Sequence, residues 1–227
     1  MTDRRFIYFA DPMCSWCWGF SPTITKVIER FGTNFSIEPI VGGLRAGNTE
    51  VLDQKGKDYI REHWEHVRDA SGQAFDFTFF DRDGFIYDTE PACRAVVTMR
   101  RIAAEYTMGY LARVHRAFYV EGLDVTRGEV LAKLATEFGI AGGTFLTEFE
   151  SDDAKAETQG DFAVTHQARI PGFPTLLAGT DDSTGDGTLT AITTGYQPWE
   201  AIEKGIENWL QSLNKSDIPN GDNENTG

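Results

Sequence analysis

The 227-residue chain has few cysteines, few basic residues and no long apolar run. Three cysteines are too few for a disulfide-built scaffold, and an odd number with one close pair indicates redox or metal chemistry instead. No segment approaches the roughly 20 apolar residues of a membrane-spanning helix. Lys and Arg number 21 against 35 Asp and Glu, which gives a net charge of −14. Because so acidic a surface repels polyanions, we expect neither nucleic acid nor a membrane as a partner.

The remaining composition is that of an ordinary globular protein, with 41% hydrophobic and 25% charged residues. At about 150 residues per domain, the length suits one globular unit that carries an insertion. Arg4 and Arg5 precede only the short apolar run of residues 6–10, whereas the apolar part of a secretory signal has roughly seven to fifteen residues. We therefore expect a cytoplasmic protein.

The two ends of the chain have the alternating strand and helix patterns of an α/β fold. Strands are predicted over residues 6–10, 35–41 and 188–194, and a tight turn that leads into a further strand over residues 171–177. Helices are predicted over residues 14–30 and 198–213. The first two strands should be parallel, because a helix connects them. The last two should form a hairpin around the turn-rich loop 181–187. Pro22 falls inside the first helix and should kink it.

The middle of the chain is predicted to be helical from about Asp53 to Arg169. Residues 88–91 have the pattern of a helix start, and residues 126–129 that of a capping box. We therefore expect a discontinuous α/β domain with an inserted all-helical subdomain. The α/β domain comprises residues 1–45 and 168–213, the insertion residues 46–167, and a polar, disordered tail residues 214–227.

Two cysteines, Cys14 and Cys17, lie at the predicted junction between the first strand and the first helix. The positive end of a helix dipole favours an anion, so a thiolate is favoured at Cys14. Cys17 lies one helical turn later and can close a disulfide with Cys14. This spacing predicts thiol–disulfide exchange, in which Cys14 attacks and Cys17 resolves the mixed disulfide. Ser15 and Trp16, which lie between the two cysteines, tune the redox potential of the pair. Asp11 opposes formation of the Cys14 thiolate if its own carboxylate is ionised nearby.

A zinc site is the main structural alternative for the cysteine pair, because two cysteines with this spacing can form half of such a site. The further ligands would have to come from Cys93, His63 and His66. His63 shares an apolar stripe with Trp64, however, which favours a histidine at the edge of the core. We therefore expect no metal. His115 likewise shares an apolar helical stripe and is expected to be structural. Cys93 lies on the apolar side of its helix and is expected to be buried and inert, although a third reactive thiol is the alternative.

Three segments of the chain carry a resemblance to a known family. The first is the run of residues 11–22, Asp-Pro-Met-Cys-Ser-Trp-Cys-Trp-Gly-Phe-Ser-Pro; the others are residues 89–95 and 172–175. Together with the α/β ends around a helical middle, these motifs resemble the thioredoxin-fold DsbA superfamily, in its FrnE-like branch of predicted protein disulfide isomerases. The resemblance covers residues 4–213. It implies a thioredoxin-like fold and a protein-disulfide oxidoreductase or isomerase.

The resemblance also implies roles for individual residues. Cys14 would be the exposed nucleophile and Cys17 the buried resolving thiol. Pro174 would be a cis-proline beside them, and the backbone of Phe173 would bind a peptide or glutathione. The substrate would be a disulfide or thiol, on a protein or on glutathione, with no other cofactor. Because Ser15-Trp16 replaces the Pro-His of the periplasmic oxidant, a reductase, isomerase or glutathione-linked activity is favoured over a strong oxidase.

Aromatic residues around the cysteines suggest how a substrate could bind. Trp16 could contribute to an apolar groove, whereas Trp18 and Phe20 are expected mainly in the core, with Trp18 as a possible accessory residue. Two other functions stay open. One is a kappa-type glutathione transferase or hydroxychromene-carboxylate isomerase on the same fold. Such enzymes use a serine at the position that Cys14 occupies in this chain. The other is a non-enzymatic module that binds zinc, or binds peptides through Trp16 and Phe173.

Overall fold

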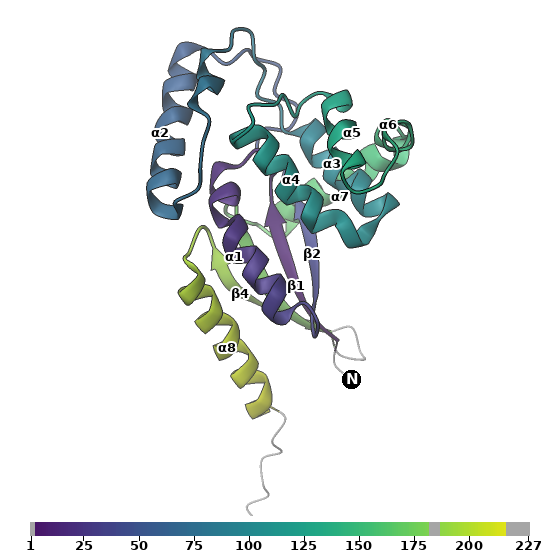
Figure 1. Ribbon diagram of the computed structural model, residues 1–227. Helices are drawn as coiled ribbons and strands as arrows, with labels where there is room; N and C mark the ends of the chain where they lie inside the picture. The colour runs from purple at the N-terminus through teal and green to yellow at the C-terminus, as the bar shows by residue number, and fades with distance from the viewer. Residues whose placement is uncertain (1–2, 182–186, 217–227) are drawn as a thin grey trace, which may run out of the picture.

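The protein is described here from a computed structural model, which describes residues 3–181 and 187–216. Strands and helices alternate at both ends of the chain, and helices fill the middle (Figure 1). In chain order the elements are β1 (Asp3–Ala10), α1 (Ser15–Phe31), β2 (Ser36–Val41), α2 (Gln54–Ser71), η1 (Phe77–Asp81), α3 (Glu90–Ile102), η2 (Ala104–Tyr106), α4 (Thr107–Tyr119), α5 (Gly128–Thr136), α6 (Gly142–Phe149), α7 (Asp152–Gln167), β3 (Thr175–Asp181), β4 (Thr188–Thr194) and α8 (Trp199–Ser216). The predicted α/β character of the ends is confirmed.

The four strands form one mixed sheet in the order β2-β1-β3-β4. β1 and β2 are parallel, as predicted from the helix that connects them. β3 is antiparallel to β1 and to β4, so the predicted hairpin is also confirmed. Of its predicted loop, residues 182–186 lie outside the described part of the chain. The carboxyl ends of β1 and β2 point to the same edge of the sheet, over which the helical segment gathers (Figure 1).

Successive side chains of β1 point to opposite faces of the sheet, and both faces are buried. Phe6 and Tyr8 face the main core, where Tyr8 stacks on Phe20 of α1 and Phe6 packs on Trp209 of α8. The alternate residue Phe9 joins a smaller cluster on the other face. α1 and α8 therefore cover one face of the sheet, and the end of β1 is held rigidly between two apolar layers (Figure 1).

Helix α1 begins at the end of this buried strand and continues through Pro22. A proline has no backbone N–H, so the carbonyl of Trp18, four residues earlier, lacks its helical partner. The side-chain amide of Gln73 donates to that carbonyl at 3.1 Å. The indole nitrogen of Trp18 donates to the carbonyl of Ala74 at 2.9 Å. The segment after α2 is thus fastened to the first turns of α1.

Two predicted boundaries in the helical segment can be compared with the structure. α3 starts where residues 88–91 predict it, with Thr89 as its N-cap. The capping box predicted at residues 126–129 is wrong, because the Thr126 hydroxyl donates to Asp124 at 2.6 Å and so does not cap α5. The N-cap of α5 is Arg127 instead, and no side chain caps this helix.

The last helix, α8, extends to Ser216, so it includes three residues of the segment predicted as a disordered tail. The rest of that segment, residues 217–227, lies outside the described part of the chain. Within residues 3–181 and 187–216, no helix has both the length and the apolar character needed to cross a membrane.

Candidate active site

Cys14 and Cys17 lie at the junction between β1 and α1, as predicted. Cys14 is the N-cap of α1 and has an extended backbone; its carbonyl accepts from the Trp18 N–H at 3.1 Å. Its own N–H donates to the Asp11 carbonyl at 3.0 Å, which closes the turn after the strand. Cys14 is 6% exposed and Cys17 is fully buried, and both carry free thiols. Cys14 is therefore not exposed, as the resemblance implied, but largely buried, because the loop at Phe173 lies against its sulfur; Cys17 is buried, as expected.

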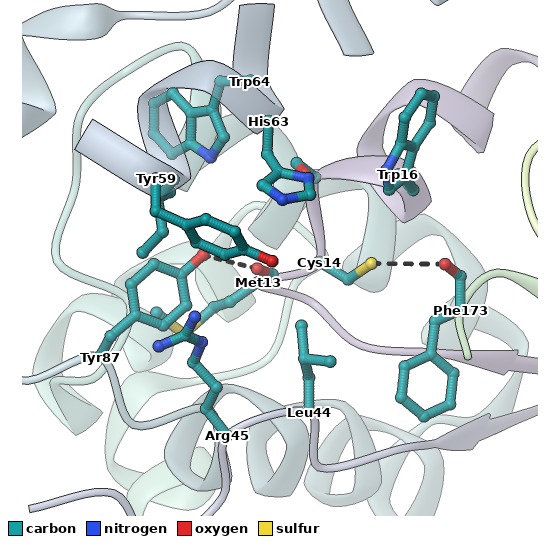
Figure 2. A pocket seen from close by; sticks show the side chains of 12 residues that line it. Met13, Cys14, Trp16, Leu44, Arg45, Tyr59, His63, Trp64, Tyr87 and Phe173 are labelled. Atoms are coloured by element: carbon teal, nitrogen blue, oxygen red, sulfur yellow. Dashed lines mark hydrogen bonds between the residues drawn. The ribbon is translucent and has the colours of Figure 1, made fainter. Parts of the chain in front are cut away.

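The Cys14 thiol lies against the loop that precedes β3. Its Sγ is 3.7 Å from the carbonyl oxygen of Phe173, and the peptide bond between Phe173 and Pro174 is cis (Figure 2). The Phe173 ring packs over Gly42, where an added Cβ would lie 1.9 Å from the ring. A glycine after β2 is thus required for the close approach of this loop to Cys14.

A cavity of about 240 Å³ opens beside Cys14, between the α1 N-terminus, the loop after β2, and α2 (Figure 2). Trp16 contributes to one wall, and its ring lies 5.5 Å from that of Tyr196. Figure 2 shows His63 and Tyr59 on the wall opposite Leu44 and Arg45. The lining residues are Met13, Cys14, Ser15, Trp16, Leu44, Arg45, Tyr59, Ile60, His63, Trp64, Tyr87 and Phe173.

Cys17 lies next to Cys14 but deeper, within the main hydrophobic core. Burial raises the pKa of the Cys17 thiol well above its usual range, and the neighbouring Cys14 thiol and the Asp11 carboxylate raise it further. Tyr8 of β1 lies beside it: burial, and then the charges of Cys17 and Cys14, raise the pKa of the Tyr8 hydroxyl. Among the described residues this hydroxyl has no hydrogen-bond partner of ordinary geometry.

Asp11 connects the loops around the cysteines. Its fully buried carboxylate accepts from the N–H of Met13 at 2.8 Å and from that of Leu44 at 2.7 Å. Burial raises the pKa of Asp11, and these N–H groups oppose the rise. The Cys93 thiol donates to the same carboxylate at 3.4 Å. Asp11 thus ties the turn before Cys14 to the loop after β2, a positional role that the sequence did not indicate.

Two other predicted residues are buried behind the site. The ring of His115 contacts the carbonyl of Asp11 at 3.2 Å and the Ser21 hydroxyl at 3.4 Å. Burial lowers the pKa of His115 to about 4, so the ring is neutral in the fold. This agrees with its predicted structural role. Cys93 is fully buried, as expected, and burial followed by the Asp11 charge raises the pKa of its thiol.

The structure brings some of the predicted site residues to the cavity and leaves others outside it. Ser15, Trp16 and Phe173 line the cavity together with Cys14. Trp18 is instead a core residue, stacked on Tyr119 with ring centroids 6.3 Å apart, as its apolar surroundings predict. The zinc alternative finds no set of ligands. No group of three or more His, Cys, Asp or Glu side chains in the described ranges could hold a metal ion.

The sequence analysis missed several residues of the cavity, of which Arg45, Tyr59 and Tyr87 are polar. Arg45 had a usable signal: it follows β2, and the carboxyl ends of parallel strands meet at one edge of a sheet. Tyr59 and Tyr87 had none, because they come from the helical segment, whose packing on the sheet no periodicity specifies. His63 also lines this cavity, at the core edge where it was predicted.

Comparisons with known proteins agree with this arrangement. The family model described as thioredoxin matches residues 7–204. A crystal structure titled "putative protein disulfide isomerase", from Nitrosomonas europaea, is 38% identical; the match covers 92% of this chain and 98% of that one, with a TM-score of 0.84. The cytosolic disulfide reductase DsbM from Pseudomonas aeruginosa, also solved with GSH, is 24% identical; that match covers 92% and 99% of the two chains, with a TM-score of 0.73.

A curated relative has a different description. The ClpXP adapter protein SpxH from Bacillus subtilis is 23% identical over 195 residues, which cover 86% of this chain. The chain spans only 64% of the length of that relative. The thioredoxin-like fold and the predicted resemblance to DsbA-type disulfide oxidoreductases and isomerases are therefore confirmed. The chain belongs to the thioredoxin family.

Proposed function

We propose that this protein is a thiol–disulfide oxidoreductase in which Cys14 is the nucleophile and Cys17 the resolving thiol. One observation supports this assignment above all. The Cys14 thiol lines a cavity beside the Phe173 carbonyl, whereas Cys17, one turn further along α1, is fully buried. A substrate in the cavity can therefore meet Cys14 but not Cys17. The Nitrosomonas europaea relative, described as a disulfide isomerase, supports the same activity.

The exchange proceeds in two displacements. The Cys14 thiolate attacks one sulfur of a substrate disulfide, a Cys14–substrate bond forms, and the other half of the substrate leaves as a thiolate. Cys17 then gives up its proton and attacks Sγ of Cys14, which releases the second substrate thiol. The substrate gains two electrons, and the protein is left with a Cys14–Cys17 disulfide. The reverse sequence oxidises a dithiol substrate.

The loop at Phe173 would orient the substrate for this exchange. Its carbonyl oxygen already lies 3.7 Å from Cys14 Sγ, so a chain bound along this loop would place its own sulfur near Cys14. Pro174 would hold the loop in position, and Trp16 and Ser15 would border the bound sulfur. Trp18 and Cys93, both buried, would act through the packing of the site alone.

The substrate in this proposal is a thiol or disulfide of a protein or of glutathione, and the two thiols transfer the electrons without a bound cofactor. The structure of DsbM with GSH supports glutathione as a co-substrate, and the description of DsbM as cytosolic supports the cytoplasm as the compartment. The dipeptide Ser15-Trp16, which carries no cation, favours a reductase or isomerase over a strong oxidant.

A redox titration tests the proposal. The purified protein is equilibrated in glutathione buffers of graded potential, quenched with acid, alkylated and weighed intact, and the alkylated cysteines are located by digestion. We expect a two-electron transition confined to Cys14 and Cys17, with Cys93 alkylated only after unfolding. If Cys14 and Cys17 remain reduced at every potential, the assignment is wrong.

A further inference from the structure

Arg45 is the feature of the cavity that the exchange chemistry leaves unexplained. It lies in the loop after β2 and lines the same cavity as Cys14. Its backbone N–H donates to the Thr89 hydroxyl at 3.1 Å, and its guanidinium lies 5.3 Å from the centre of the Tyr87 ring. The Tyr87 hydroxyl in turn donates to the carbonyl of Met13, next to Cys14, at 2.6 Å. Arg45 is thus held in place relative to the nucleophile (Figure 2).

The guanidinium of Arg45 has donors to spare. Three other half-buried arginines of this acidic protein are paired with carboxylates: Arg94 with Glu90, Arg100 with Asp161 and Glu157, and Arg113 with Glu137. Among the described residues, the Arg45 guanidinium forms no ion pair and donates no hydrogen bond. An arginine carries five N–H donors in a planar fork that matches a carboxylate.

The rest of the cavity is suited to the same kind of group. Of the described residues that line it, none is acidic, although the chain has 35 Asp and Glu residues. Two further polar side chains, those of Tyr59 and His63, lie across the cavity from Arg45 (Figure 2). The centres of their rings are 4.4 Å apart. A negative group near Cys14 would therefore find a cation on one wall, hydrogen-bonding groups on the other and no repelling charge between them.

The volume limits the size of what can enter. Pockets for small molecules usually measure about 300–1,000 Å³. At about 240 Å³, this cavity suits one arm of a small disulfide, with its acidic group, more closely than a folded polypeptide.

We propose that Arg45 binds a carboxylate of the substrate, so that the cavity selects small disulfides and thiols that carry acidic groups. This inference rests on the proposed function of Cys14, and it adds the substrate class. Arg45 is a specificity-determining residue here: it fixes the acidic end of the substrate while the sulfur lies at Cys14. The net charge of −14 would otherwise repel such a substrate, so the local cation has to offset the global field.

Three disulfides of similar length and different charge test the proposal: 3,3′-dithiodipropionate (a dianion), bis(2-hydroxyethyl) disulfide (neutral) and cystamine (a dication). They are reacted with protein carrying Cys17→Ser, so that only the first displacement occurs. The mixed disulfide at Cys14 is followed by intact mass after acid quenching, since each probe adds a different mass. The measured quantity is the ratio of second-order rate constants for the dianionic and the neutral probe.

Arg45→Gln should lower this ratio about tenfold, the loss expected when a charge-assisted hydrogen bond is removed. Arg45→Lys keeps the charge and should retain most of the ratio. The matched control is Arg61→Gln, because Arg61 also stacks on an aromatic ring, 4.7 Å from Phe80, but lies outside the cavity lining. It makes the same change in net charge and should leave the ratio within about twofold, because a charge outside the cavity acts on the probe only over a distance at which salt screens it.

An equal fall in Arg45→Gln and Arg61→Gln would show a global field effect and overturn the proposal, and so would an unchanged ratio in Arg45→Gln. If no probe forms a mixed disulfide at Cys14, the proposed function itself fails, which is a distinct result. A further measurement needs no Arg45 variant. Adipate, a dicarboxylate without sulfur, should slow the reaction of the neutral probe with the Cys17→Ser protein, whereas hexane-1,6-diol should not; equal effects of the two would also contradict the proposal.

Discussion

Cys14 and Cys17 are three residues apart on one helix, yet their surroundings differ in almost every respect. Cys14 lines a cavity and contacts a loop from the far end of the chain, at the Phe173 carbonyl. Cys17 is fully buried against Tyr8 of the central strand. The comparison shows how two identical side chains acquire different chemistry from position alone: one can meet a ligand, and the other can meet only its neighbour.

The difference arises from the strand that precedes them. β1 is buried on both faces, so α1 must start where the sheet ends, and its first residue faces out over the sheet edge. One turn later, Cys17 lies on nearly the same side of the helix but deeper in the core, where it is fully buried. Only the N-cap position, Cys14, is left at the edge, where the loop after β2 and the loop before β3 border it.

The largest expected effect comes from exchanging the two cysteines for serine one at a time. Cys14→Ser should lower disulfide turnover by at least about a thousandfold, because the buried Cys17 cannot reach a substrate. Cys17→Ser should also stop turnover, but at the mixed disulfide, which accumulates on Cys14 and is seen by intact mass. The two variants thus fail at different steps. Retained turnover in Cys14→Ser would contradict the assignment.

The buried side of the comparison can be probed by pH through His115. Its pKa is lowered to about 4 by burial, against an ordinary value of 6.5. The neutral ring is favoured in the fold, so its contribution to stability is complete above pH 6.5 and is lost as the pH falls towards 4. The 2.5-unit difference corresponds to about 3 kcal/mol in the free energy of unfolding.

We compare the free energy of unfolding in urea at pH 7 and at pH 4. The fall between these two pH values should be about 3 kcal/mol smaller for His115→Gln than for the unmodified protein, because the variant has no buried imidazole to protonate. His66→Gln is the control, because His66 is exposed on α2, and it should follow the unmodified protein. Parallel pH curves for His115→Gln and the unmodified protein would mean that His115 does not titrate with unfolding.

The cavity beside Cys14 can be disturbed through Gly42, which follows β2 and lies under the Phe173 ring. An alanine there would place its Cβ 1.9 Å from the Phe173 ring, so the loop beside Cys14 must move. We expect a loss of about 2 kcal/mol in unfolding free energy from overpacking and a slower first displacement. Gly172→Ala is the matched control, since an added Cβ there has no atom within 4 Å. Equal stability of the two variants would show that the ring can give way freely.

Most of the fold could be predicted from the sequence, because its elements have local signals. Strands β1 and β2, the parallel pairing and the hairpin all follow from short apolar runs bounded by turn residues. The capping box at Thr126 was misread, because that side chain bonds to Asp124 in the preceding loop. Such competition between local hydrogen bonds is decided by loop geometry, which the pattern of residue types does not contain.

The site was predictable only in part, for a related reason. Cys14 and Cys17 form a motif of consecutive residues, and Phe173 entered through a resemblance to known proteins. Arg45 and Tyr59 reach the cavity through the packing of one loop and one helix over the sheet edge, and this packing depends on contacts between distant segments. The role of Asp11 in joining two loops likewise became visible only when the N–H groups around it were known.

The smallest expected effect concerns the hydroxyl of Tyr8, which lies beside Cys17 without a partner of ordinary geometry. In the reduced form, burial keeps the Cys17 thiol protonated, and this hydroxyl is placed to donate to the Cys17 sulfur. Tyr8→Phe should therefore destabilise the reduced form and make the pair more reducing by about 20 mV, or about 1 kcal/mol. The unfolding free energy of the disulfide form should hardly change, because that form has no free Cys17 thiol for Tyr8 to donate to.

Tyr110→Phe gives the matched control, since the Tyr110 hydroxyl is equally buried but donates to the Leu131 carbonyl at 2.9 Å, away from the cysteines. That variant should lose about 1 kcal/mol of unfolding free energy, because the buried hydrogen bond to this carbonyl is lost, and keep its midpoint potential. Tyr8→Phe should thus change the midpoint potential without lowering the unfolding free energy of the disulfide form, and Tyr110→Phe should do the reverse. If both shifted the midpoint equally, the Tyr8 hydroxyl would have no specific relation to Cys17, and burial alone would set the contrast between the two thiols.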